Sequence, residues 1–107
     1  MLHGVNIINR WQTMTLAEQM GNIGAEVSRL LCWEAKRDED QTQKSLARAL
    51  ELIDLSIADS RWNKKELCRL REVLCSKIFA PGMYNVTAEQ LNNYFLPFAI
   101  LARKKYA

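Results

Sequence analysis

Three helix-start motifs, each followed by apolar residues at spacings of three and four, constrain this chain more than any other feature of its sequence. "TLAE" begins at Thr15, "NKKE" at Asn63 and "TAEQ" at Thr87. In a capping box the first side chain bonds to the backbone three residues on, and the acidic or amide side chain bonds back. These motifs predict the N-termini of three helices. Asp38 or Asp40, within the polar stretch "KRDEDQTQ", predicts the start of another.

The apolar spacing then gives each predicted helix its length and its buried face. We expect helices from residue 15 to about 37, from about 40 to 59, from 63 (or from Ser60) to the loop "APGMYN", and from 87 onward. The expected core residues are Leu16, Met20, Ile23, Val27, Leu30 and Leu31 on the first helix; Leu46, Ala49, Leu50, Leu52, Ile53, Leu55 and Ile57 on the second; Leu67, Leu70, Val73, Leu74 and Ile78 on the third; and Leu91, Tyr94, Phe95, Phe98 and Leu101 on the fourth.

Pro97 interrupts the fourth helical pattern, which nevertheless continues in register beyond it. Proline inside a helix removes a hydrogen bond and bends the chain, so we predict one helix with a kink at Pro97. Neither a strand pattern nor a repeat is visible. The predicted fold is an all-α four-helix bundle with antiparallel up-down neighbours. Residues 1–14 are expected to form an N-terminal extension, and residues 15–107 a single helical-bundle domain.

The composition fits one globular domain and gives no sign of a metal or cofactor site. The 107 residues include three cysteines, Cys32, Cys68 and Cys75, and a single histidine, His3. Zinc sites need paired short spacings of Cys and His, which are missing here, so we expect reduced, buried thiols. No apolar run is long enough to span a membrane, and "MLHGVNIINRW" does not resemble a signal peptide. We therefore expect a cytoplasmic protein without cofactors.

Glu51 and Asp54, three residues apart on the second predicted helix, are the strongest candidates for catalytic carboxylates. The structural alternative is an ion pair between Asp54 and Arg69 or Arg71, and a similar pair for Glu26. Hydrolases and small helical nucleases need a histidine on a core helix, and the sequence has none there. A phosphate-binding Gly-rich loop is also missing. We expect a protein that is not an enzyme.

Charge is unevenly distributed along the chain: residues 1–59 carry a net charge of −3 and residues 60–107 a net charge of +6. This asymmetry favours either an acidic or nucleic-acid partner, or two acidic helices packed beside two basic ones. Lysine and arginine at a helix C-terminus also need no ligand, because they complement the helix dipole. The candidate residues for binding nucleic acid or an acidic partner are Arg61, Lys64, Lys65, Arg69, Arg103, Lys104 and Lys105.

A row of small residues lies on the first predicted helix: Ala17, Gly21, Gly24 and Ser28. Glycine in a helix costs about 1 kcal/mol relative to alanine, and close packing of another helix can offset that cost. The alternative is a Gly-x-x-Gly loop that clamps a nucleic-acid backbone, but such a loop lies between helices rather than within one. The row predicts a contact groove, filled by a helix of this chain or of another copy.

Four blocks of the sequence, "LAEQMGNIGAEVSRLLCW", "RALELIDLSIAD", "ELCRLREVLC" and "NNYFLPFAILAR", resemble small helical proteins of bacteria. The resemblance extends to accessory proteins of diversity-generating retroelements, the reverse-transcriptase systems that mutagenise a target gene. It covers residues 11–103. It implies a four-helix bundle that assembles into a basic ring and binds the reverse transcriptase and its RNA. This chain is less basic than those proteins, and no site residue can be carried over.

Two functions remain in view. The first is a non-enzymatic helical-bundle accessory protein acting within an assembly, with a reverse transcriptase and its RNA as partners. The second is a structural or regulatory protein-interaction module, a homo-oligomer or adaptor, that has no contact with nucleic acid. In both functions the chain binds a protein or a second copy of itself, and the first function adds RNA. Neither function involves a membrane or a small-molecule substrate.

Overall fold

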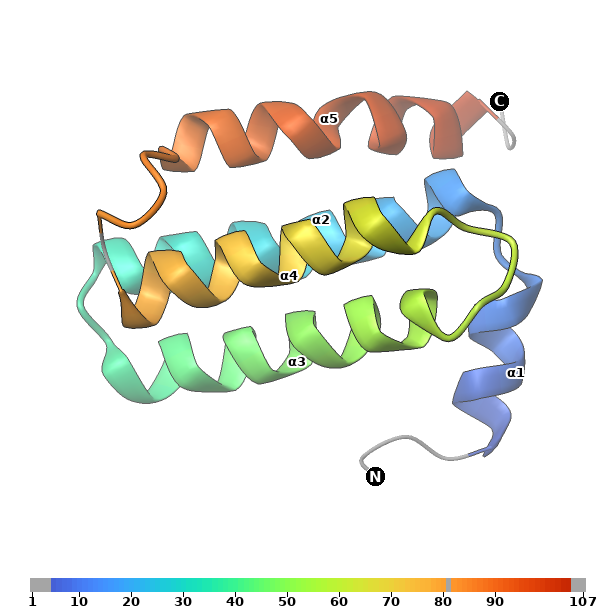
Figure 1. Cartoon of the computed structure of the whole chain (residues 1–107), viewed down its shortest axis with the longest axis horizontal. Helices are drawn as coiled ribbons and strands as arrows, with labels where there is room; N and C mark the ends of the chain where they lie inside the picture. The colour runs from blue at the N-terminus through green and yellow to red at the C-terminus, as the bar shows by residue number, and fades with distance from the viewer. Residues whose placement is uncertain (1–4, 81, 105–107) are drawn as a thin grey trace.

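The computed structural model of the chain describes residues 5–80 and 82–104, which form five helices and contain no strand (Figure 1). The helices are α1 (Val5–Thr13), α2 (Leu16–Ala35), α3 (Glu39–Ile57), α4 (Lys64–Phe79) and α5 (Ala88–Lys104). The four longer ones run in alternating directions, and α1 lies across one end of them. The all-helical prediction is confirmed, and α1 is a helix within the segment predicted as an extension.

Local capping signals place most of the helix starts. Thr15 and Glu18 form the predicted capping box, and Asp38 caps α3 by accepting from the Gln41 amide. At α5, the Thr87 hydroxyl accepts from the Gln90 backbone amide, while the Gln90 side chain accepts from the Thr87 amide. These capping bonds satisfy backbone groups that the first turn would otherwise leave without a partner.

The cap of α4 differs from the prediction. Asn63 caps it through the Lys65 amide, as a capping residue should. Glu66, however, does not complete a capping box, because its carboxylate accepts a hydrogen bond from the Tyr94 hydroxyl of α5. The side chain predicted to bind its own helix end is used between two helices instead.

The core follows the predicted stripe of α2, takes only three residues of the wider stripe predicted for α3, and adds Trp11 from α1. Trp11 is 4% exposed, so the segment predicted as an extension contributes to the core. Leu101 was expected inside and is 55% exposed, because α5 packs mainly on α2 and lacks a second close neighbour. The buried apolar residues are Trp11, Met20, Ile23, Val27, Leu30, Leu31, Leu46, Ala49, Ile53, Leu67, Leu70, Leu74, Leu91 and Phe95.

Two further expectations concern single residues. Pro97 lies inside α5, which remains one helix to Lys104, and the kink there stays a prediction. The thiols are free, as expected, but the expectation of burial is wrong: Cys32 and Cys68 are exposed and Cys75 is half-buried. The cysteines fall on outer faces because the leucines of the same helices already fill the core. None of the helices in the described part of the chain combines the length and apolar composition needed to cross a bilayer.

Candidate functional site

The bundle is open along one side. α2 packs along both α3 and α5, and α3 packs on α4, but α4 and α5 have almost no close backbone contact within the described residues. A closed four-helix bundle would bring the last helix against two neighbours. Here α5 has one main neighbour, α2, and forms an outer edge of the molecule (Figure 1).

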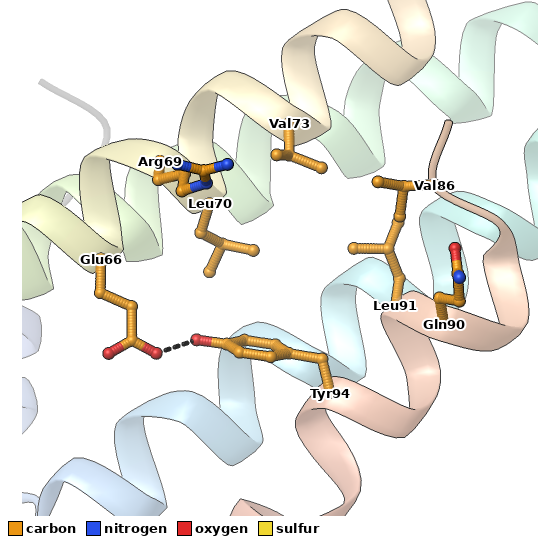
Figure 2. Close-up of a pocket in the computed structure, with 8 residues that line it drawn as sticks. All are labelled: Glu66, Arg69, Leu70, Val73, Val86, Gln90, Leu91 and Tyr94. Carbon is orange, nitrogen blue, oxygen red and sulfur yellow. Dashed lines mark hydrogen bonds between the residues drawn. The ribbon is translucent and has the colours of Figure 1, made fainter. Parts of the chain in front are cut away.

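An apolar groove lies where α4 and α5 diverge, with a volume of about 220 Å³. Figure 2 shows side chains of α4 on one side of this hollow and those of α5 and the preceding loop on the other. Polar groups occur at its margins rather than its floor. The lining residues are Glu66, Arg69, Leu70 and Val73 from α4, and Val86, Gln90, Leu91 and Tyr94 from the other side. The groove is therefore an apolar surface with a mixed polar rim.

One polar bridge crosses the groove. The Tyr94 hydroxyl donates to the Glu66 carboxylate, as Figure 2 shows. Burial and this carboxylate raise the pKa of Tyr94, so the phenol keeps its proton at neutral pH. The Tyr94 ring also makes edge-to-face contacts with Phe95 and Phe98, with centroid separations of 5.1 and 5.9 Å. The bridge thus holds a fixed aromatic surface at one end of the groove.

The predicted basic cluster is divided by the structure. Arg61 is separate from the other basic residues, because its guanidinium pairs with Asp59 at 2.6 Å and donates to the carbonyls of Gln12 and Met14. Its role is to hold the α1–α2 turn against the segment before α4. Of the other members, Arg69 lines the groove. Those that stay exposed are Lys64, Lys65, Arg69, Arg103 and Lys104, and Lys105 lies outside the described residues.

The exposed basic residues gather toward one end of the molecule. α4 begins and α5 ends at the same end, because the two helices run in opposite directions (Figure 1). Lys64 and Lys65 are in the first turn of α4, and Arg103 and Lys104 are in the last turn of α5. These four basic residues therefore lie toward the same end of the molecule.

The small residues of α2 contact α5 of the same chain. A Cβ added at Gly24 would lie 2.7 Å from the Phe95 Cβ, closer than such atoms approach in proteins. One added at Gly21 would lie 3.9 Å from the Ala99 Cα, an ordinary contact. The Ser28 hydroxyl is hydrogen bonded to Asn92 at 2.9 Å. The close contact at Gly24 is therefore made with a helix of the same chain.

A buried polar network, absent from the sequence predictions, joins α1, α2, α3 and the α3–α4 segment. Gln19 is fully buried, and its amide donates to the Trp11 carbonyl at 2.9 Å and to Asp59 at 3.3 Å. Its carbonyl accepts from the Ser56 hydroxyl and the Trp62 indole, both at 2.8 Å. All the hydrogen-bonding positions of this amide are used. The only sequence signal was a glutamine within an otherwise apolar face.

The carboxylates considered for catalysis have structural partners. Asp54 pairs with Arg71 at 2.9 Å, one of the two predicted alternatives, and the Asp54 side chain is exposed. Glu26 pairs with Arg29 at 2.6 Å and with Arg48 at 3.4 Å. Among the described residues, no three His, Cys, Asp or Glu side chains come close enough together to hold a metal ion.

Asp59 gives the network a predictable response to acid. The hydrogen bond from Arg61 holds the pKa of Asp59 well below its usual range, against the effect of burial. A lowered folded-state pKa stabilises the fold above the unfolded value of about 3.9, and the gain is lost as the pH falls below it. Asp59→Asn is expected to lower the free energy of unfolding by about 2 kcal/mol at pH 7. The loss should be smaller at pH 3.

Urea unfolding of both proteins at pH 7 and pH 3 measures this difference. The matched control is Asp54→Asn, which breaks an exposed ion pair and should change stability by less than about 1 kcal/mol. Equal losses for Asp59→Asn at both pH values would contradict the assignment of this acid response to Asp59.

Comparison of the chain with protein-family models, with curated proteins and with solved structures found no match.

Proposed function

We propose that this protein is a non-enzymatic helical-bundle accessory or adaptor protein of the cytoplasm that works by binding a partner protein. The supporting observation is the apolar groove between α4 and α5, which the chain's own helices leave open. The active unit in this proposal is the four-helix bundle α2–α5, with α1 tied across its end through the Gln19 network.

The partner we propose is an amphipathic helix with acidic residues beside its apolar face. Helices bind helical proteins in this way by placing one apolar side in a groove. The α4 side of the groove carries Arg69 and Glu66, and Lys65 lies one turn before Arg69, so two positive charges stand there against one negative charge. Gln90 on the α5 side is uncharged. The rim therefore has spare positive charge, which favours carboxylates on the bound helix.

Two matched synthetic helices test this proposal. Both present the same leucine stripe, flanked by glutamates in one peptide and by lysines in the other. We expect the glutamate peptide to bind at least about tenfold more tightly than the lysine peptide. The glutamates can form one or two charge pairs with the rim, and the lysines cannot. Methyl NMR spectra should show shifts at Leu70, Val73, Val86 and Leu91. Val73→Asp should abolish binding. Ala47→Asp, at an exposed position of α3, should leave binding unchanged.

The more specific form of the proposal, a reverse transcriptase and its RNA, follows from the resemblance in the sequence. It is supported by the basic residues that gather where α4 begins and α5 ends. Direct RNA binding would show a steep dependence on salt, reduced when Lys64, Lys65 and Arg69 are replaced by glutamine. A chain that binds RNA in this way and neither peptide would contradict the groove proposal and favour nucleic acid instead.

A further inference from the structure

The outward side of α5 carries an apolar stripe with no partner in the described structure. Leu96 is 54% exposed and Ile100 is 47% exposed. They lie one turn apart on α5, and the helical spacing places them on the side away from the buried Leu91 and Phe95. Adjacent large apolar side chains this exposed mark an interaction surface on a water-soluble helix.

The residues along this stripe follow the spacing of a helix-pairing seam. Glu89, Asn93, Leu96, Ile100 and Arg103 are all exposed and recur at intervals of four, three, four and three. That 3.5-residue period keeps side chains in line with a second helix packed alongside. The stripe therefore has the period of a two-helix contact, with its apolar members in the middle.

Charge at the two ends of the stripe identifies the second helix. Glu89 lies in the first turn of α5, and Arg103 and Lys104 lie in the last. None of these three has an ion-pair partner among the described residues. The acidic and basic ends are 14 positions apart, roughly 21 Å along a helix. An antiparallel copy of the same helix would bring each acidic end beside the other's basic end.

We propose that two copies of this chain associate through α5, in an antiparallel pair related by a two-fold axis at Leu96. Each copy then presents the same surface to the other, as a two-fold interface requires. Leu96 packs on its own counterpart, Ile100 packs near Asn93 of the other copy, and Glu89 pairs with Arg103 and Lys104. Antiparallel alignment also places the helix dipoles in their favourable arrangement.

The surface beside the stripe allows close approach. A shallow hollow of about 430 Å³ lies next to Leu96 and Arg103, with Gly21, Ala25 and Ser28 of α2 in its wall. Short side chains there leave room for the apolar side chains of a second α5. This interface is separate from the α4–α5 groove, so an experiment that contradicts the dimer does not contradict the proposed adaptor function, and the reverse also holds.

Charge reversal in two separate variants tests the orientation of the dimer. Glu89→Lys gives a chain with a wholly basic stripe, and Arg103→Glu with Lys104→Glu gives one with a wholly acidic stripe. By sedimentation equilibrium, each variant alone should dimerise at least about tenfold more weakly than the original chain. An equimolar mixture should recover the original affinity as a heterodimer, because both end contacts are then complementary.

Further measurements make the outcome decisive. Leu96→Asp places two carboxylates at the axis and should weaken the dimer at least about thirtyfold, while Ala47→Asp on α3 should not affect it. All these side chains are exposed, and circular dichroism checks that each variant keeps its helices. A chain that stays monomeric at 200 µM protein (about the highest practical concentration) overturns the proposal. So does a dimer that is insensitive to Leu96→Asp, or a mixture that forms no heterodimer.

Discussion

Gly24→Leu is expected to lower the free energy of unfolding by about 3–5 kcal/mol, enough to unfold a marginal domain of this size. Even a methyl group at this position would meet the Phe95 Cβ at 2.7 Å and its Cγ at 2.8 Å. These atoms lie next to the α5 backbone, so a larger side chain can be accommodated only by moving the helix. Because α5 has little other packing besides α2, its displacement would expose much of the core.

The neighbouring glycine is the matched control for this prediction. Gly21→Ala adds a methyl at ordinary contact distance, so the gain in helix propensity should dominate and stabilise the fold by about 0.5–1 kcal/mol. Gly24→Ala should instead destabilise it by about 1–2 kcal/mol after that same gain. Urea unfolding of the three variants measures the series. If Gly24→Leu kept normal stability and lost only self-association, the packing of Phe95 on Gly24 would be contradicted.

The glycines also explain why the bundle is open. The short side chains of α2 let α5 approach at Phe95 and Ala99, and this close contact fixes α5 on one side of the molecule. α4 is held on the other side by α3. The row of small residues was visible in the sequence as a contact surface. Which helix would fill it, and that α4 would be left apart from α5, depends on packing between distant segments.

Local signals in the sequence predicted α2 to α5 and missed α1. Thr15, Asp38 and Thr87 cap helices through bonds to residues at most three positions away, so their identity is enough to place a helix start. The apolar spacing of α2 and α3 likewise determines which side is buried. Glu66 was misassigned because its local partner and Tyr94, 28 positions later, compete for the same carboxylate. Local patterns carry no information about that competition.

The candidate sites were less predictable for the same reason. Lysine and arginine mark a basic segment, but only the fold shows that Arg61 is held by Asp59 while Arg69 borders an apolar groove. Leu101 fits the helical period of α5 and is exposed because α5 lacks a second neighbour. A pattern predicts one buried face for each helix, and cannot predict that part of that face stays available to a partner.

Gln19→Leu is expected to lower the free energy of unfolding by about 3–5 kcal/mol, the largest loss among changes that add no bulk. Leucine fills similar space but leaves the Ser56 hydroxyl and the Trp62 indole without the acceptor they share, and it removes one of the two donors to the Trp11 carbonyl, which keeps the Met14 amide. A desolvated donor or acceptor that loses its partner costs about 1–3 kcal/mol. Urea unfolding, monitored by tryptophan fluorescence, measures the loss of stability. Gln43→Leu, at an exposed position of α3, is the control.

Gln19→Glu separates the network from simple packing. It is nearly isosteric, but it replaces the amide donor that faces Asp59 at 3.3 Å with a second carboxylate. Repulsion between the two would raise the pKa of the new carboxyl in the folded state, so protonation stabilises the fold. We expect a large loss of stability at pH 7 and partial recovery by about pH 5, where Asp59 is still ionised. If Gln19→Glu lost no stability at pH 7, Gln19 would act by its shape alone, and its amide bonds to Asp59 and to the Trp11 carbonyl would add little.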